Sequence, residues 1–178
     1  MLYQIIALLL EVIAGLLTST CLLRLYMQYQ RIPLSARSGN PLGRFIFALT
    51  DWLVLPLRRV LPAMGRWDTA SLAGAFLVQL AEFAVLWALN GAGASLLSVA
   101  VLAVFGVLRT ALSGMTVLVL VYAILSWVQT QSYLADLLER LVQPPLSPIR
   151  RVLPLVGGVD LSPLALLCLL YTSPSPRD

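Results

Sequence analysis

The sequence contains no histidine and no lysine, and its only cysteines are Cys21 and Cys168, both inside apolar runs. It therefore lacks the ligands of a haem attachment site and of a His/Cys zinc site, and the base of a His-based catalytic triad. Each cysteine is interpreted as a small apolar residue of a helix. No phosphate-binding glycine loop or metal-ligand spacing is present, so neither an enzyme nor a cofactor is expected.

Charge is also scarce. Only 11% of the 178 residues are charged and 60% are hydrophobic, whereas soluble domains are about 25% charged. The apolar residues form uninterrupted blocks of roughly 20, the length that a helix needs to cross a bilayer. An all-α membrane protein is expected. The first apolar block has no basic n-region and no small-residue cleavage site, so it is interpreted as a retained helix and not as a signal peptide.

All 12 basic residues are arginines, set against 8 acids, and most of them lie between the apolar blocks. This distribution is typical of the positive-inside rule for membrane proteins. A nucleic-acid-binding module would instead present basic residues with aromatics on a soluble face. The Arg-rich loops are therefore expected on the cytoplasmic side, with the lipid bilayer as the partner and no direct contact with nucleic acid.

The apolar blocks predict spans from about Leu2 to Leu25 and from Thr69 to Leu89, followed by the long stretch from Ser95 to Val128. Apolar spacing alone permits one helix or two in that stretch. Charge favours a single crossing, because both Arg-rich loops then lie on one side. Two amphipathic helices, Leu42 to Leu55 and Tyr133 to Val142, are too short to span and are expected at the membrane interface, ended by Pro56 and by Pro144-Pro145.

A motif, Pro-x-Arg-Arg-Val-Leu-Pro, occurs twice. Placing Pro56 on Pro148 aligns, without a gap, Arg58, Arg59, Val60, Leu61, Pro62, Gly65 and Asp68 with Arg150, Arg151, Val152, Leu153, Pro154, Gly157 and Asp160. We therefore predict two parallel helix-loop-helix hairpins, residues 1–94 and 95–170. About four transmembrane helices result. The last one would start near Leu161 and is truncated, because the roughly ten residues before the tail are well short of a span. The tail, residues 171–178, shares nothing with the repeat and is treated as non-native.

The duplicated arginines are the most distinctive polar feature. Prolines on both sides restrict the backbone around Arg58, Arg59, Arg150 and Arg151, and planar guanidinium groups suit phosphate. The functional interpretation is binding of anionic lipid headgroups or of an acidic partner surface. The alternative is topology anchoring alone.

Asp68 and Asp160 lie just before their predicted helices. A carboxylate there can cap free amides and meets the positive end of the helix dipole, so capping is the favoured role. Pairing of Asp68 with Arg58 or Arg59, and the equivalent pairing of Asp160, is a further expectation.

Three ionisable residues lie inside predicted spans, namely Glu11, Glu82 and Arg109. With a single third crossing, all three fall in the half of the bilayer away from the Arg-rich loops. They are expected to form a charge cluster, either as an ion or proton path or, as we favour, as a structural contact between helices. Small residues at Gly15, Gly74, Gly106, Ser113 and Gly114 are expected to let helices approach closely.

The chain resembles the YggT family of small bacterial membrane proteins, which also has plastid relatives. The resemblance lies in Glu11, Leu23 to Gln28, Asn40-Pro41, Pro56 to Gly65, Ser126 to Val128 and Pro148 to Pro163. It implies two such units and about four spans in a bacterial inner membrane, with a last helix that continues past Ser162-Pro163. Arg66-Trp67, where the second repeat has Gly158-Val159, departs from the tighter loop pattern.

The resemblance also implies links to osmotic tolerance, to cell-division gene neighbourhoods and, in plastids, to cytochrome assembly and nucleoid distribution. The leading hypothesis is a non-enzymatic scaffold or assembly factor that acts through its Arg pairs. The rival is a small transporter or channel that uses Glu11 and Glu82. Partner proteins are not identified, and self-association into a homo-oligomer is left open.

Overall fold

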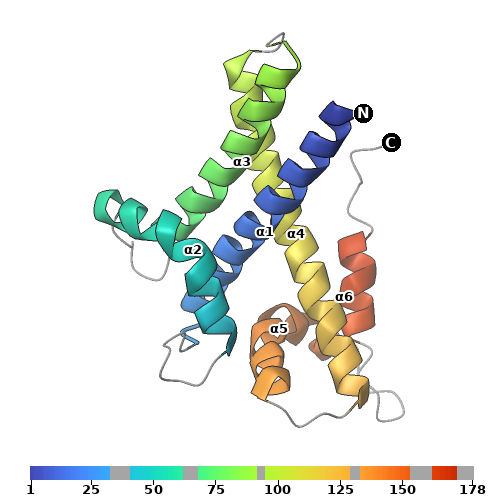
Figure 1. The fold of residues 1–178 in the computed structure, drawn as a ribbon. Coiled ribbons are helices and arrows are strands. Elements are labelled where there is room, and N and C mark those ends of the chain that lie inside the picture. Colours follow the sequence, from blue (N-terminus) through green and yellow to red (C-terminus); the bar gives the residue numbers. More distant parts are fainter. Residues whose placement is uncertain (33–40, 62–67, 92–94, 129–132, 153–161, 172–178) are drawn as a thin grey trace. The chain divides into compact units, whose positions relative to one another are not determined.

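The computed structural model describes residues 1–32, 41–61, 68–91, 95–128, 133–152 and 162–171. Within those ranges every regular element is an α-helix, which confirms the expected all-helical class (Figure 1). The helices are α1 (Leu2–Tyr29), α2 (Pro41–Val60), α3 (Thr69–Leu89), α4 (Leu96–Val128), α5 (Tyr133–Val152) and α6 (Ser162–Tyr171).

Three of these helices, α1, α3 and α4, are long and apolar enough to cross a membrane. The stretch whose helix count the sequence left open is one continuous helix, α4, of 33 residues. Helix α6 has 10 residues, about 15 Å of rise, which is half the thickness of a bilayer core. The described chain therefore has three candidate spans, and the fourth one expected is only the short α6.

Helices α1 and α3 run antiparallel. At one end, Asn90 at the C-terminus of α3 donates a hydrogen bond to the hydroxyl of Tyr3 at the start of α1, at 2.7 Å. Gly91 then ends α3 with a left-handed backbone, φ 78°, a conformation that suits glycine after a helix. This pairing brings the C-terminal end of α1 and the N-terminal end of α3 to the same side, where α2 joins them.

The amphipathic helices are longer than the sequence predicted. Pro56 lies inside α2, and the helix continues to Val60; likewise α5 runs through Pro144 and Pro145. A proline removes one backbone hydrogen bond, but Leu57, one residue later, packs on the core between α1 and α3 and holds the next turn in place. Figure 1 shows α2 as a bent ribbon.

This extension changes the duplicated motif. Arg58 and Arg59 belong to the last turn of α2 and not to a loop, so the predicted loop location was wrong. Basic side chains in a last turn interact favourably with the helix dipole. The bounds of α2 and α5 differ by 92 residues at both ends, 41 to 133 and 60 to 152, the same offset that separates the two copies of the motif.

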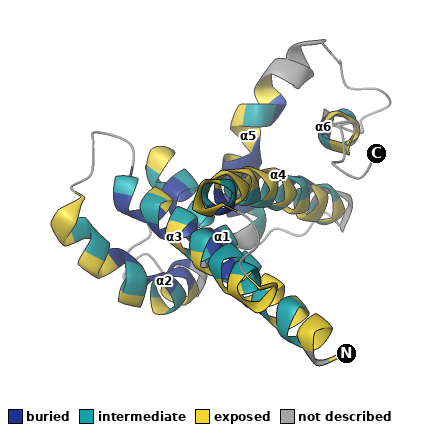
Figure 2. Cartoon of the chain, turned by 90° about the horizontal axis from the view of Figure 1, so that it is seen from above, coloured by how far each residue is buried: buried dark blue, intermediate teal, exposed yellow. Residues whose placement is uncertain are grey.

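Helix α2 has two different faces. Ile46, Thr50 and Val54 are almost fully buried, and Val54 packs with Cys21 of α1 and Ala75 of α3. Phe45, Trp52 and Leu55 are exposed on its other side, so buried and exposed colours alternate along α2 in Figure 2. Helix α2 is therefore both part of the core and a surface element.

By internal packing the chain divides into two units, Met1–Ala111 and Leu112–Asp178, with the boundary inside α4. The core of the second unit is formed by Val119 of α4, Val142 and Leu146 of α5, and Leu166 of α6. This division describes packing. The expected repeats, residues 1–94 and 95–170, are defined by sequence duplication and stay a prediction.

Two of the small residues lie at helix contacts. A Cβ atom on Gly74 would be in ordinary contact with Leu53 and Leu57 of α2, whereas one on Gly106 of α4 would overlap the side-chain amide of Gln79 on α3. Gly15 of α1 has no atom of the described chain within 4 Å of its Cβ position. Among the described residues, the predicted packing role thus applies to Gly74 and Gly106 but not to Gly15 or Gly114.

Candidate functional site

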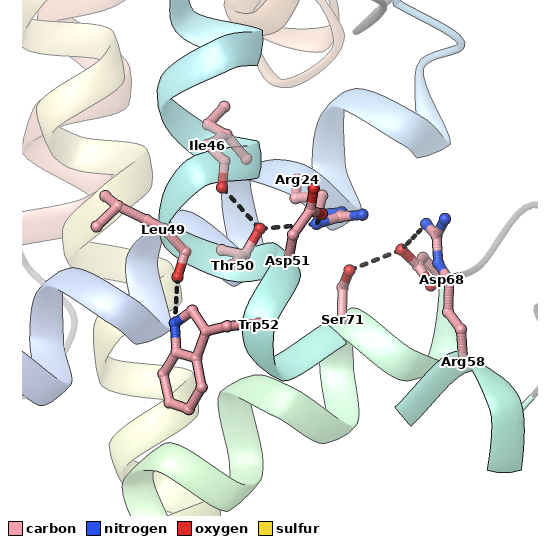
Figure 3. A network of polar contacts seen from close by, with 9 residues as sticks. All are labelled: Arg24, Ile46, Leu49, Thr50, Asp51, Trp52, Arg58, Asp68 and Ser71. Carbon is pink, nitrogen blue, oxygen red and sulfur yellow. Dashed lines mark hydrogen bonds and ion pairs between the residues drawn. The ribbon is translucent and has the colours of Figure 1, made fainter. Parts of the chain in front are cut away.

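The buried guanidinium of Arg24 ties α1 to α2. Its Nη1 donates to Asp51 Oδ1 and to the hydroxyl of Thr50, both at 2.7 Å, and its Cζ atom lies 4.8 Å from the centre of the Phe47 ring. The side chain of Arg24 is 2% exposed and that of Asp51 is 40% exposed. The buried guanidinium of Arg24 is thus paired with a carboxylate, that of Asp51, which is partly accessible to water. Figure 3 shows the two side chains.

A second ion pair ties the end of α2 to the start of α3. Arg58 Nη2 donates to Asp68 Oδ2 at 2.6 Å, and the hydroxyl of Ser71 donates to the same oxygen at 2.6 Å. Gln28 of α1 completes the site when its amide is oriented to satisfy both neighbours. Its nitrogen then donates to Asp68 Oδ2 at 2.6 Å, and its oxygen accepts from Arg58 Nη2 at 2.9 Å.

These contacts define an interhelical polar cluster at the shared end of the three helices. Its members come from α1, α2 and the N-terminal end of α3, and they are Arg24, Gln28, Thr50, Asp51, Arg58, Asp68 and Ser71. Six of these seven side chains are drawn in Figure 3. Because hydrogen bonds to charged groups are stronger than neutral ones, the cluster fixes α2 against the two spans.

The carboxylate of Asp68 is charged in this setting. Burial by itself would raise the pKa of Asp68, but hydrogen bonds from Arg58 and Ser71, together with the charges of Arg58 and Arg24, lower it below its ordinary value. The side chain is 1% exposed. Its stabilising role therefore depends on remaining ionised.

The favoured capping role of Asp68 is not observed. Asp68 occupies the N-cap position of α3, but among the described residues its side chain makes no capping hydrogen bond. Only its backbone oxygen accepts from the amides of Ser71 and Leu72. The carboxylate is turned instead toward Arg58, because a buried charge gains more from a full counter-ion than from a partial helix dipole.

The two arginines of the first motif differ. Arg58, with its side chain 36% exposed, is committed to Asp68, whereas Arg59 is exposed. Arg150 and Arg151 fall within the backbone of α5, but their side chains lie outside the described part of the structure, as does the whole of Asp160. Arg59 and, at the other end of α2, the exposed Arg44 are therefore the described arginines of this helix that face outward.

The predicted intramembrane residues lie near one another. Glu82 of α3 is buried and accepts a hydrogen bond from Gln79 at 2.8 Å, and Gln79 also reaches the hydroxyl of Thr18 on α1 at 3.5 Å. Both Glu11 and Arg109 interact electrostatically with Glu82. Glu11 and Arg109 themselves are exposed.

Sequence reasoning missed the part that Arg24, Gln28 and Asp51 play in the cluster. Arg24 lies within the predicted first span and was given no role, although an arginine inside that helix is itself a signal that an acid lies nearby. Asp51, on the polar side of α2, was the matching signal. Arg24 and Asp51 are 27 residues apart in the sequence, so local spacing could not identify them as partners.

Comparison with known proteins shows similarity to one family of uncharacterized proteins. The chain matches the CCB3/YggT family over residues 3–89 and 101–173. It is 37% identical to an uncharacterized protein, YggT, of Escherichia coli K12, over 92% of this chain and 84% of that one. Uncharacterized proteins of Pseudomonas aeruginosa and Haemophilus influenzae are 34% and 30% identical, over 87% and 84% of this chain and 79% and 78% of theirs. No solved structure matches it.

Proposed function

This chain belongs to the CCB3/YggT family, and from that premise we propose that it is a non-enzymatic scaffold of the bacterial inner membrane whose α2 helix binds anionic lipid headgroups. Helix α2 would lie along the cytoplasmic surface, with Arg59 and Arg44 at the level of the phosphates. Phosphate is a natural ligand for the planar fork of arginine. The proposal includes the parallel repeat, so that α5 with Arg150 and Arg151 would take the equivalent place in the second half.

The two-faced character of α2 carries this proposal. Its inner face is held on α1 and α3 by Val54 and by the two ion pairs. Its outer face exposes Phe45, Trp52 and Leu55, which in a soluble environment would form an apolar patch. Aromatic and aliphatic side chains flanked by arginine are typical of a helix that lies in the headgroup region.

Different roles for Arg58 and Arg59 are supported by their different surroundings. Arg58 is held by Asp68 and Gln28, so its guanidinium is largely occupied. Arg59, one residue later, has no such role and is exposed. We therefore assign headgroup binding to Arg59, supported by Arg44, and a positioning role to Arg58.

The test is fluorescence quenching of Trp52 by brominated lipids, in a full-length protein in which Trp67, Trp87 and Trp127 are replaced by Phe. Brominated phosphatidylglycerol should quench Trp52 more strongly than brominated phosphatidylcholine. The preference should disappear in R44Q/R59Q and remain in the matched control R44K/R59K, which keeps the charge. Equal quenching by both lipids in the unsubstituted background would contradict headgroup binding and favour topology anchoring or a protein partner.

A second candidate function, ion or proton passage through Glu11 and Glu82, is favoured by the burial of Glu82 beside Gln79 and Thr18. A buried acid inside a span marks a functional site by default. Flux measurements on proteoliposomes test it, with Glu82→Gln as the variant. Flux that Glu82→Gln removes would establish transport, and absence of flux in the unsubstituted protein would leave Glu82 with a structural role.

A further inference from the structure

Two side chains of opposite charge, Glu11 and Arg109, are exposed inside membrane-spanning helices. Arg109 lies 13 residues after the start of α4 and 16 before Leu125, near the middle of the helix. In a hydrocarbon core about 30 Å thick, such a position is roughly 15 Å from either surface. An arginine side chain is too short to reach water over that distance by snorkelling. Lipid alone is therefore a poor environment for this charge.

Neither residue forms a direct ion pair among the described residues. The ion pairs formed there are Arg24 with Asp51 and Arg58 with Asp68, and neither pair includes Glu11 or Arg109. Both side chains interact electrostatically with Glu82, so they belong to one polar patch shared by α1, α3 and α4. That patch has an acid and a base at its exposed positions.

A surface of this kind is complementary to itself. In a contact with two-fold symmetry the same patch is present on both partners, so residue i of one copy meets residue j of the other and the reverse. Glu11 of one copy would then face Arg109 of the second, and Arg109 would face its Glu11. Both charges become paired without any other protein.

The face around Glu11 allows the close approach that such a contact needs. Gly15 follows Glu11 by one helical turn and has no described atom within 4 Å of its Cβ position. Leu8 and Val12, on the same side of α1, are exposed. Small residues at a helix surface let a neighbouring helix approach its backbone, and apolar neighbours then exclude lipid from the charges.

We propose that this patch is the interface between two copies of the chain, joined across the two-fold axis by ion pairs between Glu11 and Arg109. This proposal is independent of headgroup binding by α2, because the two surfaces lie on different parts of the first unit. If the protein is monomeric but Trp52 still shows a lipid preference, the dimer proposal is contradicted and the headgroup proposal is not.

The decisive experiment is a charge swap in trans. Full-length E11R and R109E are each reconstituted alone in phosphatidylglycerol/phosphatidylcholine vesicles and then together, and association is measured by energy transfer between labelled copies. Each variant alone places like charges opposite one another, so self-association should fall about tenfold or more. The mixture restores both ion pairs between unlike copies and should recover the association of the unsubstituted protein.

Several outcomes would overturn the proposal. The unsubstituted protein could be monomeric, the single swaps could leave association unchanged, or well-folded E11R and R109E could fail to associate with each other. The double variant E11R/R109E should associate with itself. If it folds but E11R and R109E do not associate, the pairing is within one chain.

A cysteine experiment keeps the proposal testable if a swapped chain fails to fold. In a background with Cys21 and Cys168 replaced by Ser, V12C should form a disulfide-linked dimer on mild oxidation. The matched control is L77C, because Leu77 is also exposed but lies five residues before Glu82, about 140° around α3 from it. Equal cross-linking of V12C and L77C, or none in either, would contradict the assigned face.

Discussion

The ion pair between Arg24 and Asp51 is asymmetric, because only one partner has access to water. Asp51 is 40% exposed and can be hydrated alone. Arg24 is 2% exposed, and if Asp51 is lost it keeps the hydroxyl of Thr50 and the ring of Phe47 but no anionic partner among those in the described ion pairs. Removing the partner of a buried charge costs about 3 to 5 kcal/mol. Loss of the buried charge itself leaves no uncompensated group behind.

We therefore predict that Asp51→Ala lowers the free energy of unfolding by about 3 kcal/mol, whereas Arg24→Met, which keeps the length of the stem, lowers it by about 1 kcal/mol. Thermal unfolding in detergent, followed by circular dichroism, shows which of the two variants is less stable. If Arg24→Met is the more damaging change, the guanidinium contributes more by packing on Phe47 than by its charge.

Asp68 makes stability depend on acid pH. Its pKa is lower in the folded protein than in the unfolded chain, so the unfolded state binds the proton more readily. The stabilisation is fully present above the unfolded-state pKa of about 4 and is lost as the pH falls through the lower folded-state pKa. At neutral pH the dependence vanishes.

The prediction is a melting temperature that is constant from pH 7 to pH 5 and falls below about pH 4. At pH 7, Asp68→Asn should lower the free energy of unfolding by about 1.5 to 3 kcal/mol and therefore also the melting temperature. The variant should then lose less of its melting temperature at acid pH than the unsubstituted protein does. Asp136→Asn, on an exposed residue of α5, is the control for general effects of losing a carboxylate. An acid transition equally steep in Asp68→Asn would assign it to other groups.

At the scale of whole helices, two glycines on similar apolar helices have different tolerance for a methyl group. Gly74 has room, since the nearest side-chain atom would lie 3.5 Å from an added Cβ. At Gly106 the same methyl would overlap Gln79 and come within 2.9 Å of Phe83. Displacing Gln79 would remove the hydrogen bond that Glu82 receives from it.

Gly106→Ala is accordingly expected to lower stability by about 1 to 3 kcal/mol, and Gly74→Ala to be neutral or slightly stabilising, because alanine is the better helix former. The measurement is the melting temperature of both variants in one detergent. Gln79→Ala combined with Gly106→Ala should recover part of the loss, since the overlapping amide is gone. Equal tolerance at both positions would mean that α3 and α4 separate easily.

At the scale of the whole molecule, the three candidate spans allow two topologies, which differ only in which side of the membrane the first span starts from. Helix α2 follows the first candidate span, and α5 follows the third. If all three cross the membrane, crossing parity predicts α2 and α5 on one side and the end of α3 on the other. The concentration of arginine around α2 and α5 predicts that this side is the cytoplasmic one.

Single cysteines introduced at Val60, Gln143 and Asn90, with both native cysteines replaced by alanine, test this topology. A membrane-impermeant maleimide should label N90C in intact spheroplasts and should label V60C and Q143C only after lysis. Labelling of V60C before lysis would invert the orientation. Opposite accessibility of V60C and Q143C would show that α4 does not cross.

Much of the fold follows from local patterns. The span Thr69–Leu89 was predicted with its observed bounds, because an uninterrupted apolar block has one stable arrangement in lipid. The start of α2 was also found, since the amphipathic helix predicted from Leu42 begins at Pro41. The ends of α2 and α5 were not, since a proline removes only one hydrogen bond and the contacts of Leu57 with distant residues keep α2 helical beyond it.

The ingredients of the site were predictable, and so was one of its connections. Pairing of Asp68 with Arg58 or Arg59 was expected, and the pair with Arg58 is observed, whereas the pairing of Arg24 with Asp51 was not expected. The sequence by itself determined a helical membrane protein, a duplicated arginine motif and three ionisable residues within spans, because composition and periodicity are local properties. Only the tertiary structure decided that Arg58 binds Asp68, that Arg24 reaches Asp51, and that Glu11 and Arg109 are exposed beside a buried Glu82. The physical reason is that ion pairs form between the faces that helices turn toward one another, and those faces are set by packing between residues far apart in the chain.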